Sequence, residues 1–225
     1  MATIIISLGG SLINPRGIDT AYLKRFSTLI KRLSKKNSFV IVTGGGTTAR
    51  TYINALRQAG FQEPYLSSVG IEATKLHASL VAAFFHELRF PLVSLQEVEK
   101  ELKKSSVVIC GALGFTPNIT SDADAAEIAE HLHAPLFINL TNVNGLYTKN
   151  PASKGARLIQ KISHEAFRKL AHKKAYRAGQ HFVLDQTAAT IISRARIKTL
   201  ILNGKGLSNL EKALQGEKFL GTTIT

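Results

Sequence analysis

The sequence predicts an α/β fold, a three-layer α/β/α sandwich around a mostly parallel central sheet. Short apolar runs rich in β-branched residues alternate with stretches of helical periodicity along nearly all of the 225 residues. The runs themselves, such as Phe-Val-Ile-Val at 39–42, have the composition of buried strands. In sheets of this kind, ligands bind at the carboxyl ends of the strands. We therefore expect the functional site at that edge.

The predicted elements follow one another in a nearly regular alternation. Strands are predicted at the short apolar runs 3–8, 39–42, 91–95, 107–110, 136–140 and 199–202. Helices are predicted where apolar residues recur at spacings of three and four, at 20–36, from about Ala49, and at 70–88, 98–103, 122–133, 165–172, 186–196 and 207–215. Loops are expected at 14–19 and 60–68, a turn with a returning strand at 142–147, and a β-like end in the tail 216–225.

Glycine-bearing turns follow several of the predicted strands, at 9–10, 44–46, 111–114, 145 and 204. Glycine permits backbone angles that a Cβ would forbid, and the N–H groups at the start of a following helix favour an anion. After the glycines at 44–46, hydroxyl residues can cap a helix, and Arg50 lies one turn inside it. A single turn of this kind is equally well explained as a structural turn with a surface arginine. The joint placement of these turns favours a ligand rich in phosphate.

Length and composition favour a cytoplasmic globular protein. The chain fits one large α/β domain or two small lobes, and 44% of its residues are hydrophobic. No apolar run has the ~18 to 20 residues of a membrane span. No basic leader precedes a cleavable apolar segment, and the one cysteine, Cys110, rules out an internal disulfide. We therefore expect no contact with a membrane.

The net charge of +14 indicates an affinity for polyanions, which include nucleic acids, anionic lipids and nucleotides. The densest basic patch lies at 157–177 and has no interleaved aromatic pattern and no zinc-ligand spacing. A solvated helix face is the favoured interpretation of that patch. Binding to nucleic acid is possible but not favoured.

Motifs along the whole chain resemble the amino-acid-kinase superfamily, and within it most closely the archaeal-type uridylate kinases. The matching stretches lie at 7–11, 44–50, 70–76, 120–126, 141–147, 178–179 with 183–185, and 221–224. Each stretch alone is a weak signal, but their order along the chain is specific for the superfamily. The resemblance implies one domain over residues 1–225, with an N-terminal part that binds the acceptor and a C-terminal part that binds ATP. It also implies phosphoryl transfer from ATP to UMP, Mg²⁺ carried by ATP, and a homohexamer.

The resemblance also implies roles for individual residues. It places ATP against Gly9, Gly10, Ser11, Gly45, Arg50, Thr141, Asn142, Tyr147 and Asn150. It places UMP against Gly44, Ser67, Gly114, Phe115, Thr116, Pro117, Asn118, Ile119, Thr120 and Ser121. The catalytic candidates are Asp122, Lys154 and Asp185, and no residue is expected to form a metal site of its own.

Physical chemistry leaves alternatives open for these catalytic candidates. Asp122 matches a family aspartate that organises the cations facing the phosphates, but it and Asp185 are also placed as N-cap carboxylates. Lys154 is either a cation near the γ-phosphate or a solvated loop lysine. The histidines at 77, 86, 131 and 172 have no partners at metal-ligand spacing, and we interpret them as packing or surface residues.

The sequence departs from the family pattern near the nucleotides. Asparagine replaces the usual aspartate at 142, 144 and 150, and serines at 67–68 replace an aspartate that holds the acceptor ribose. Two alternatives to a UMP kinase therefore stay open. One is a related kinase with another phosphate or carboxylate acceptor. The other is a weakly active nucleotide-binding regulator with affinity for nucleic acid.

Overall fold

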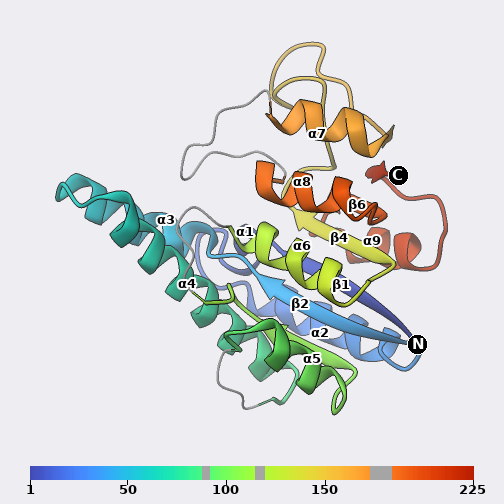
Figure 1. Cartoon of the computed structure of the whole chain (residues 1–225), viewed down its shortest axis with the longest axis horizontal. Helices are drawn as coiled ribbons and strands as arrows, with labels where there is room; N and C mark the ends of the chain where they lie inside the picture. Colours follow the sequence, from blue (N-terminus) through green and yellow to red (C-terminus); the bar gives the residue numbers. More distant parts are fainter. Residues whose placement is uncertain (88–91, 115–119, 173–183) are drawn as a thin grey trace.

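The computed structural model describes residues 1–87, 92–114, 120–172 and 184–225 (Figure 1). Within these residues, one seven-stranded sheet has the order β3-β2-β1-β4-β6-β7-β5. Its strands are β1 (Ala2–Leu8), β2 (Asn37–Thr43), β3 (Val107–Cys110), β4 (Leu136–Thr141), β5 (Lys161–Ile162), β6 (Thr199–Asn203) and β7 (Thr222–Ile224). Neighbouring strands run parallel except for the antiparallel pair β6 and β7. The predicted mostly parallel sheet is thus confirmed.

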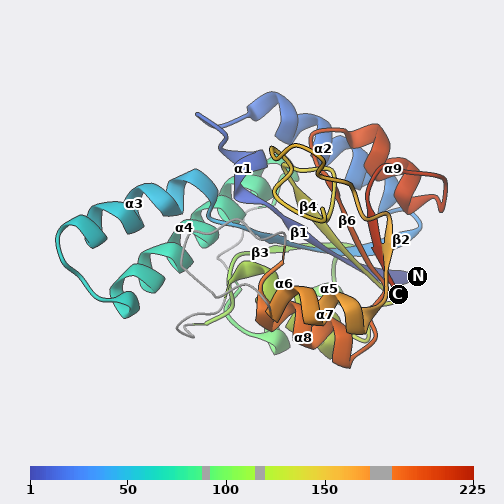
Figure 2. The ribbon, with the colours of Figure 1, turned by 90° about the horizontal axis from the view of Figure 1, so that it is seen from above.

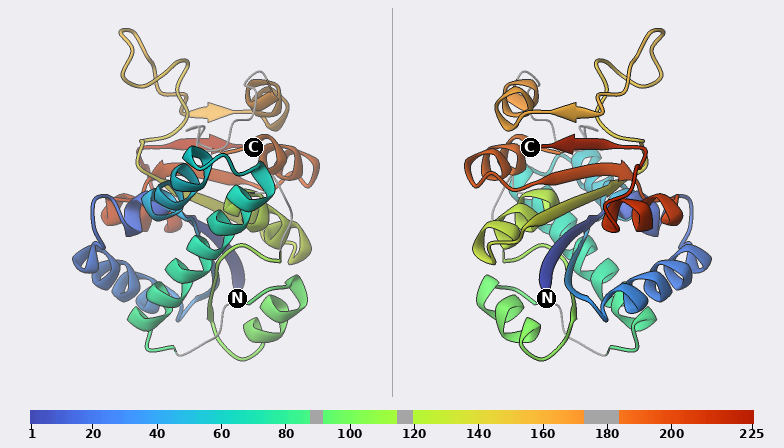
Figure 3. Two further views of the ribbon diagram at one scale, coloured as in Figure 1. Left: turned by 90° about the vertical axis from the view of Figure 1, so that its left-hand side faces the viewer. Right: turned by 90° about the vertical axis from the view of Figure 1, so that its right-hand side faces the viewer.

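Helices cover both faces of the sheet, as the views along it show (Figures 2 and 3). On one face pack α2 (Thr20–Leu33), α4 (Glu63–Phe84) and α9 (Leu207–Leu214). On the other face pack α5 (Leu95–Leu102), α6 (Ser121–His131), α7 (His164–His172) and α8 (Gln186–Arg194). The short α1 (Gly10–Ile13) follows β1, and α3 (Gly46–Gln58) follows β2. The three-layer prediction is confirmed.

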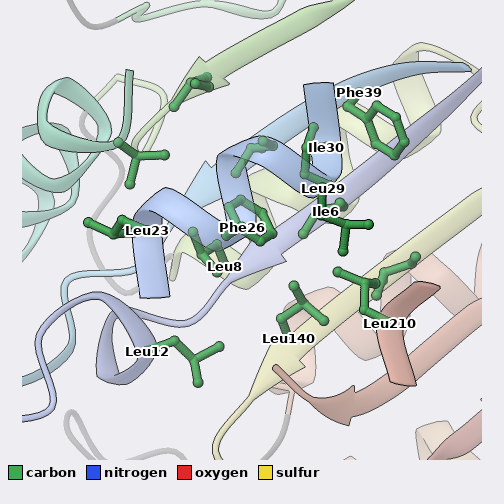
Figure 4. Packing of buried hydrophobic residues seen from close by; sticks show 14 of the residues in the cluster. Ile6, Leu8, Leu12, Leu23, Phe26, Leu29, Ile30, Phe39, Leu140 and Leu210 are labelled. Atoms are coloured by element: carbon green, nitrogen blue, oxygen red, sulfur yellow. The ribbon is translucent and has the colours of Figure 1, made fainter. Parts of the chain in front are cut away.

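Strand β1 shows why the sheet needs both helical layers. Ile4, Ile6 and Leu8 belong to the hydrophobic cluster beneath α2, and Ile5 belongs to the cluster on the opposite face. Successive side chains of a strand point to opposite faces, so an apolar run buries both sides. Figure 4 shows Phe26 of α2 packed near Leu8 and its neighbours in this core.

Helices α3 and α4 pack against each other and extend beyond the sheet (Figures 1 and 2). The prediction of a loop over 60–68 is wrong from Glu63 onward, because α4 begins there. Pro64 lies in the first turn of α4, where its missing N–H is one that the helix leaves unpaired in any case. The helix predicted at 70–88 therefore starts two turns earlier, and it ends at Phe84.

Other differences concern short elements. The strand predicted at 91–95 is not formed in its described part, because Ser94 caps a helix that starts at Leu95, and 88–91 lie outside the described residues. The returning strand predicted at 142–147 is only an isolated bridge between Tyr147 and Leu158. Strand β5 and helix α1 were not anticipated, because elements of two to four residues carry too little periodicity. Among the described helices, none combines the length and apolar character needed to cross a membrane.

Candidate active site

A cleft of about 300 Å³ opens at the carboxyl ends of β1, β2 and β4. It is bounded by the starts of α1, α3 and α6 and by the first half of α4. Its lining consists of Ser7, Gly9, Gly10, Ser11, Gly44, Gly45, Gly46, Ala49, Arg50, Ile53, Glu63, Leu66, Ser67, Gly70, Ile71, Thr74, Ala112, Thr120, Ser121, Asp122, Thr141 and Asn142. Most of the predicted nucleotide-binding residues that the structure describes therefore meet in one place.

The first two glycine turns lie directly against each other. A Cβ on Gly10 would lie 2.3 Å from Gly46 N and 2.4 Å from Gly44 O, closer than real Cβ contacts come. Gly46 also has a φ of +53°, a left-handed conformation that favours glycine. Hydrogen bonds fix the turns to the sheet, because Gly44 N donates to Leu8 O over 2.9 Å. Two backbone segments thus line one wall of the cleft.

Arg50 contributes a positive charge to this wall. It lies one turn into α3, and its Nη2 donates to Thr47 Oγ1 over 3.0 Å. Among the described residues that line the cleft, it is the one lysine or arginine. Most of the net charge of +14 is therefore located away from the cleft.

Asp122 lies in the first turn of α6 and is held by residues of two strands. Its Oδ1 accepts hydrogen bonds from Ser7 Oγ over 2.5 Å and from Asn139 Nδ2 over 3.0 Å. Burial raises the pKa of Asp122 to about 7, and the negative charge of Asp185 adds to this rise, while the bonds from Ser7 and Asn139 oppose it. Because the pKa of this carboxyl group is near neutral pH, a cation placed beside it would lower the pKa and favour the charged carboxylate.

Asp185 lies next to the cleft rather than on its surface. It caps α8, with its Oδ1 accepting from Thr187 N over 2.7 Å and from Ala188 N over 2.9 Å. Its Oδ2 accepts a hydrogen bond from the hydroxyl of Thr120, which lines the cleft and caps α6. The capping interpretation of Asp185 is thus correct as geometry, and Thr120 connects this cap to the site.

The other predicted site residues do not line the cleft. Tyr147 lies in the isolated bridge, Asn150 is exposed and closes a local turn by accepting from Ala152 N over 3.0 Å, and Lys154 is exposed. Gly114 has a φ of +66° in the loop after β3. The predicted residues Phe115, Thr116, Pro117, Asn118 and Ile119 lie outside the described residues.

Sequence reasoning missed one residue that lines the cleft and three buried residues that lie next to its lining. Glu63 lines the cleft one helical turn before Ser67, and the predicted loop over 60–68 obscured that relation. Asp124 is buried and accepts from Leu113 N over 3.1 Å, and burial raises its pKa to about 7. Asn139 and His77 also contact the site from behind. Their partners are distant in sequence, so periodicity alone carries no signal for these contacts.

The carboxylate of Asp122, which lines the cleft, fits a hard cation carried by a bound nucleotide. Asn139 Oδ1 is buried next to this carboxylate and has no hydrogen-bond partner in the described part of the chain. Carboxylate and amide oxygens are the ligand types that Mg²⁺ prefers. No group of three or more His, Cys, Asp or Glu among the described residues is placed to hold a metal ion.

Comparison with known proteins places the chain in a family. Residues 2–203 match the model of the amino acid kinase family, and the chain belongs to that family. It is 33% identical to a uridylate kinase from Methanospirillum hungatei, over 100% of this chain and 95% of the relative. It is 34% identical to a uridylate kinase from Archaeoglobus fulgidus, over 98% of this chain and 99% of that one.

Solved structures agree with this assignment. The crystal structure of the uridylate kinase from Archaeoglobus fulgidus superposes with a TM-score of 0.87 at 32% identity, with 100% of both chains covered. A structure of isopentenyl phosphate kinase superposes with a TM-score of 0.73 at 20% identity, which supports the fold alone. The resemblance drawn from the sequence motifs is confirmed.

Proposed function

We propose that this chain is an ATP-dependent kinase that transfers the γ-phosphoryl group of ATP to UMP, giving UDP for pyrimidine nucleotide synthesis. One observation carries the proposal. Paired glycine turns, a helix N-terminus and Asp122 meet in one cleft, in a chain that is similar over its full length to uridylate kinases. Phosphoryl transfer depends mainly on positioning and on charge stabilisation, which such a cleft supplies.

The glycine turns at 9–10 and 44–46 form one wall of the cleft, which we call the glycine wall. We assign this wall to the phosphates of ATP. Backbone N–H groups at a helix N-terminus favour an anion and need no reorganisation during the reaction. The assigned residues are Gly9, Gly10, Ser11 and Gly45, with Arg50 as the charged partner. Thr141 and Asn142 also line the cleft, with Thr141 next to Gly9, and we assign them, with Tyr147 and Asn150 outside the cleft lining, to the ribose and base.

We assign UMP to the side of the cleft near α4 and α6. The proposed contacts are Gly44, Ser67, Thr120 and Ser121, together with Gly114 and the residues that follow it. Glu63 adds a carboxylate one turn from Ser67, and such a group can accept hydrogen bonds from sugar hydroxyls. The phosphate end of UMP then faces the glycine wall.

The nucleophile in this reaction needs no protein base. The second pKa of a phosphate monoester is about 6, so an oxygen of UMP is already ionised at neutral pH. That oxygen attacks the γ-phosphorus, the bond to the β-phosphate oxygen breaks, and ADP leaves. The protein holds the two phosphates in line and balances their charge.

Asp122 therefore has an electrostatic role in our proposal. Mg²⁺ carried by ATP would neutralise phosphate charge, and the carboxylate of Asp122, which lines the cleft, would face it. Ser7 and Asn139 fix the orientation of the carboxylate. Lys154 stays a candidate cation for the γ-phosphate, and Asp185 a candidate that acts through Thr120.

We further propose that residues 1–225 form one domain that works as a cytoplasmic homohexamer. The sheet joins strands from both halves of the chain, and the cleft has walls from both. Exposed apolar side chains on α3 and α4 support an interface, with Tyr52 at 60% and Leu76 at 62% exposure. Light scattering that gives a mass near that of a single 24.4 kDa chain would contradict this assembly.

The acceptor is tested by incubating the chain with ATP, Mg²⁺ and one candidate at a time, and following ADP release. The panel is UMP, CMP, dUMP, AMP, isopentenyl phosphate and acetylglutamate. We expect the fastest release with UMP. Release with another acceptor and none with UMP would make the chain a related kinase. No release with any acceptor, despite ATP binding, would indicate a nucleotide-binding regulator.

A further inference from the structure

A buried histidine lies directly behind the glycine wall. His77 on α4 is 1% exposed, and its Nδ1 lies 2.7 Å from Gly44 O. Its Nε2 lies 2.9 Å from Thr48 Oγ1 in the first turn of α3. Thr48 Oγ1 in turn accepts a hydrogen bond from Asn14 Nδ2 over 2.8 Å. The chain of contacts thus joins α4, the glycine turn at 44–46, the first turn of α3 and Asn14, which caps the end of α1.

The partners determine which ring nitrogen carries the proton. A carbonyl oxygen only accepts, so Nδ1 must donate to Gly44 O. Thr48 accepts from Asn14 and has its own O–H left to donate, so Nε2 accepts from Thr48. Burial lowers the pKa of His77, which favours this neutral ring. Each polar group in the series therefore has a partner of the right kind.

This arrangement determines the direction of an N–H group in the wall. The peptide between Gly44 and Gly45 is planar and trans, so its carbonyl and its N–H point in opposite directions. His77 does not line the cleft, so the carbonyl that it holds is turned away from the cleft. The N–H of Gly45 is then turned toward it. In the described residues this N–H has no protein acceptor.

We propose that His77 is a positioning residue, which holds the Gly44 carbonyl so that the Gly45 N–H is presented to a nucleotide phosphate. Thr48 keeps the ring in the required orientation, and Asn14 keeps Thr48 in place. A tetrahedral phosphate in the cleft would find this donor already oriented, which lowers the cost of ordering the wall on binding. The proposal rests on the phosphate role that we propose for the glycine turns.

Two substitutions separate the contacts of the ring. His77→Asn keeps an N–H donor near the position of Nδ1, so it retains the Gly44 contact and loses the Thr48 contact. His77→Gln places its amide near the position of Nε2, so it retains the Thr48 contact and loses the Gly44 contact. Thr48→Ser and Thr48→Val form the matched pair on the supporting side. His86→Asn is the control, since His86 is exposed and its φ of +61° suits asparagine.

The measurements are kcat and KM for ATP and UMP, ATP binding by calorimetry, and the thermal midpoint of each variant. We expect His77→Gln to lower kcat/KM for ATP by about tenfold, the size of one hydrogen bond to a charged group. We expect His77→Asn to stay within about threefold of the wild type, and Thr48→Ser to restore what Thr48→Val loses.

Two results would overturn the proposal. One is an equal loss of kcat/KM for ATP in His77→Asn and His77→Gln. The other is a loss of kcat/KM that, across all the variants, is accounted for by the fall in thermal midpoint alone. A wild-type chain that binds ATP but does not phosphorylate UMP would contradict the proposed acceptor instead. In that case the calorimetric comparison of the variants still tests the positioning role of His77.

Discussion

Two regions of the molecule carry predicted ATP-binding residues, and they are built differently. In the glycine wall, backbone packs on backbone, and Gly10 is buried against Gly44 and Gly46. In the segment from Tyr147 to Lys154, side chains are partly or fully exposed and the contacts are local. In the first region the backbone segments lie so close together that a side chain on Gly10 would clash with residues 44–46. The second has the freedom of a surface loop, so its role depends on what binds there.

The largest effect that we expect comes from Asp122→Asn, which tests the charge beside the glycine wall. Asparagine keeps an oxygen that accepts from Ser7 and Asn139, so the local geometry is conserved. We expect kcat to fall by roughly 10²- to 10³-fold, as for removal of one transition-state contact, with little change in ATP affinity. Steady-state kinetics and calorimetry on the same sample measure both. A weakened ATP affinity with unchanged kcat would assign Asp122 to ground-state binding.

The pH dependence of the free energy of unfolding shows whether Asp122→Asn acts on the buried carboxyl group without disrupting the fold. The pKa of Asp122 is about 7 in the fold and 3.8 for the free side chain. Between those values the folded chain keeps a proton that the unfolded chain has lost, so the free energy of unfolding falls as pH rises. Asparagine does not titrate, so in Asp122→Asn this fall in the free energy of unfolding with pH is absent. We expect equal stability near pH 4 and an advantage for the variant of at most ~4 kcal/mol above pH 7, in urea unfolding without nucleotide.

Gly10→Ala tests whether the wall tolerates any side chain. The added Cβ would meet backbone atoms of residues 44–46 at 2.3 to 2.7 Å, and backbone cannot move aside as a flexible side chain can. We expect a destabilisation of about 1–3 kcal/mol and a loss of kcat/KM of roughly 10²-fold. Gly206→Ala is the matched control, because its Cβ would find no atom closer than 3.7 Å. Full activity in Gly10→Ala would show that the turns are not rigid.

Glu63→Gln tests the acceptor side of the cleft. Glutamine keeps the size of the side chain but removes the charge that accepts from sugar hydroxyls. We expect KM for UMP to rise by about tenfold, or about 1.4 kcal/mol, with KM for ATP unchanged. Glu72→Gln on the same helix is a control, because Glu72 is exposed and pairs with Lys75. A parallel rise in both KM values would place Glu63 outside the acceptor site.

The sequence predicts the regular parts of this molecule better than the contacts between distant segments. Apolar periodicity located the long elements, and glycine located the turns, because both signals are local. A proline such as Pro64 fits a loop and the first turn of a helix equally well, so the sequence alone does not place Glu63 on α4. The contacts of His77 with Gly44 and Thr48 form only when α4 packs on α3. No local pattern encodes such a contact.

Lys154→Ala should have the smallest effect, and it decides how far the comparison of the two regions holds. Lys154 is exposed and does not line the cleft, so the interpretation as a solvated loop lysine predicts a change in kcat of less than about twofold. Lys149→Ala is the control, because it removes a positive charge from the same exposed segment and so measures the effect on kcat of losing charge there. A loss of kcat beyond about tenfold for Lys154 alone would mean that its ammonium group reaches the γ-phosphate once ATP is bound. The segment would then close over the nucleotide, and the site would consist of one rigid wall and one wall that forms on binding.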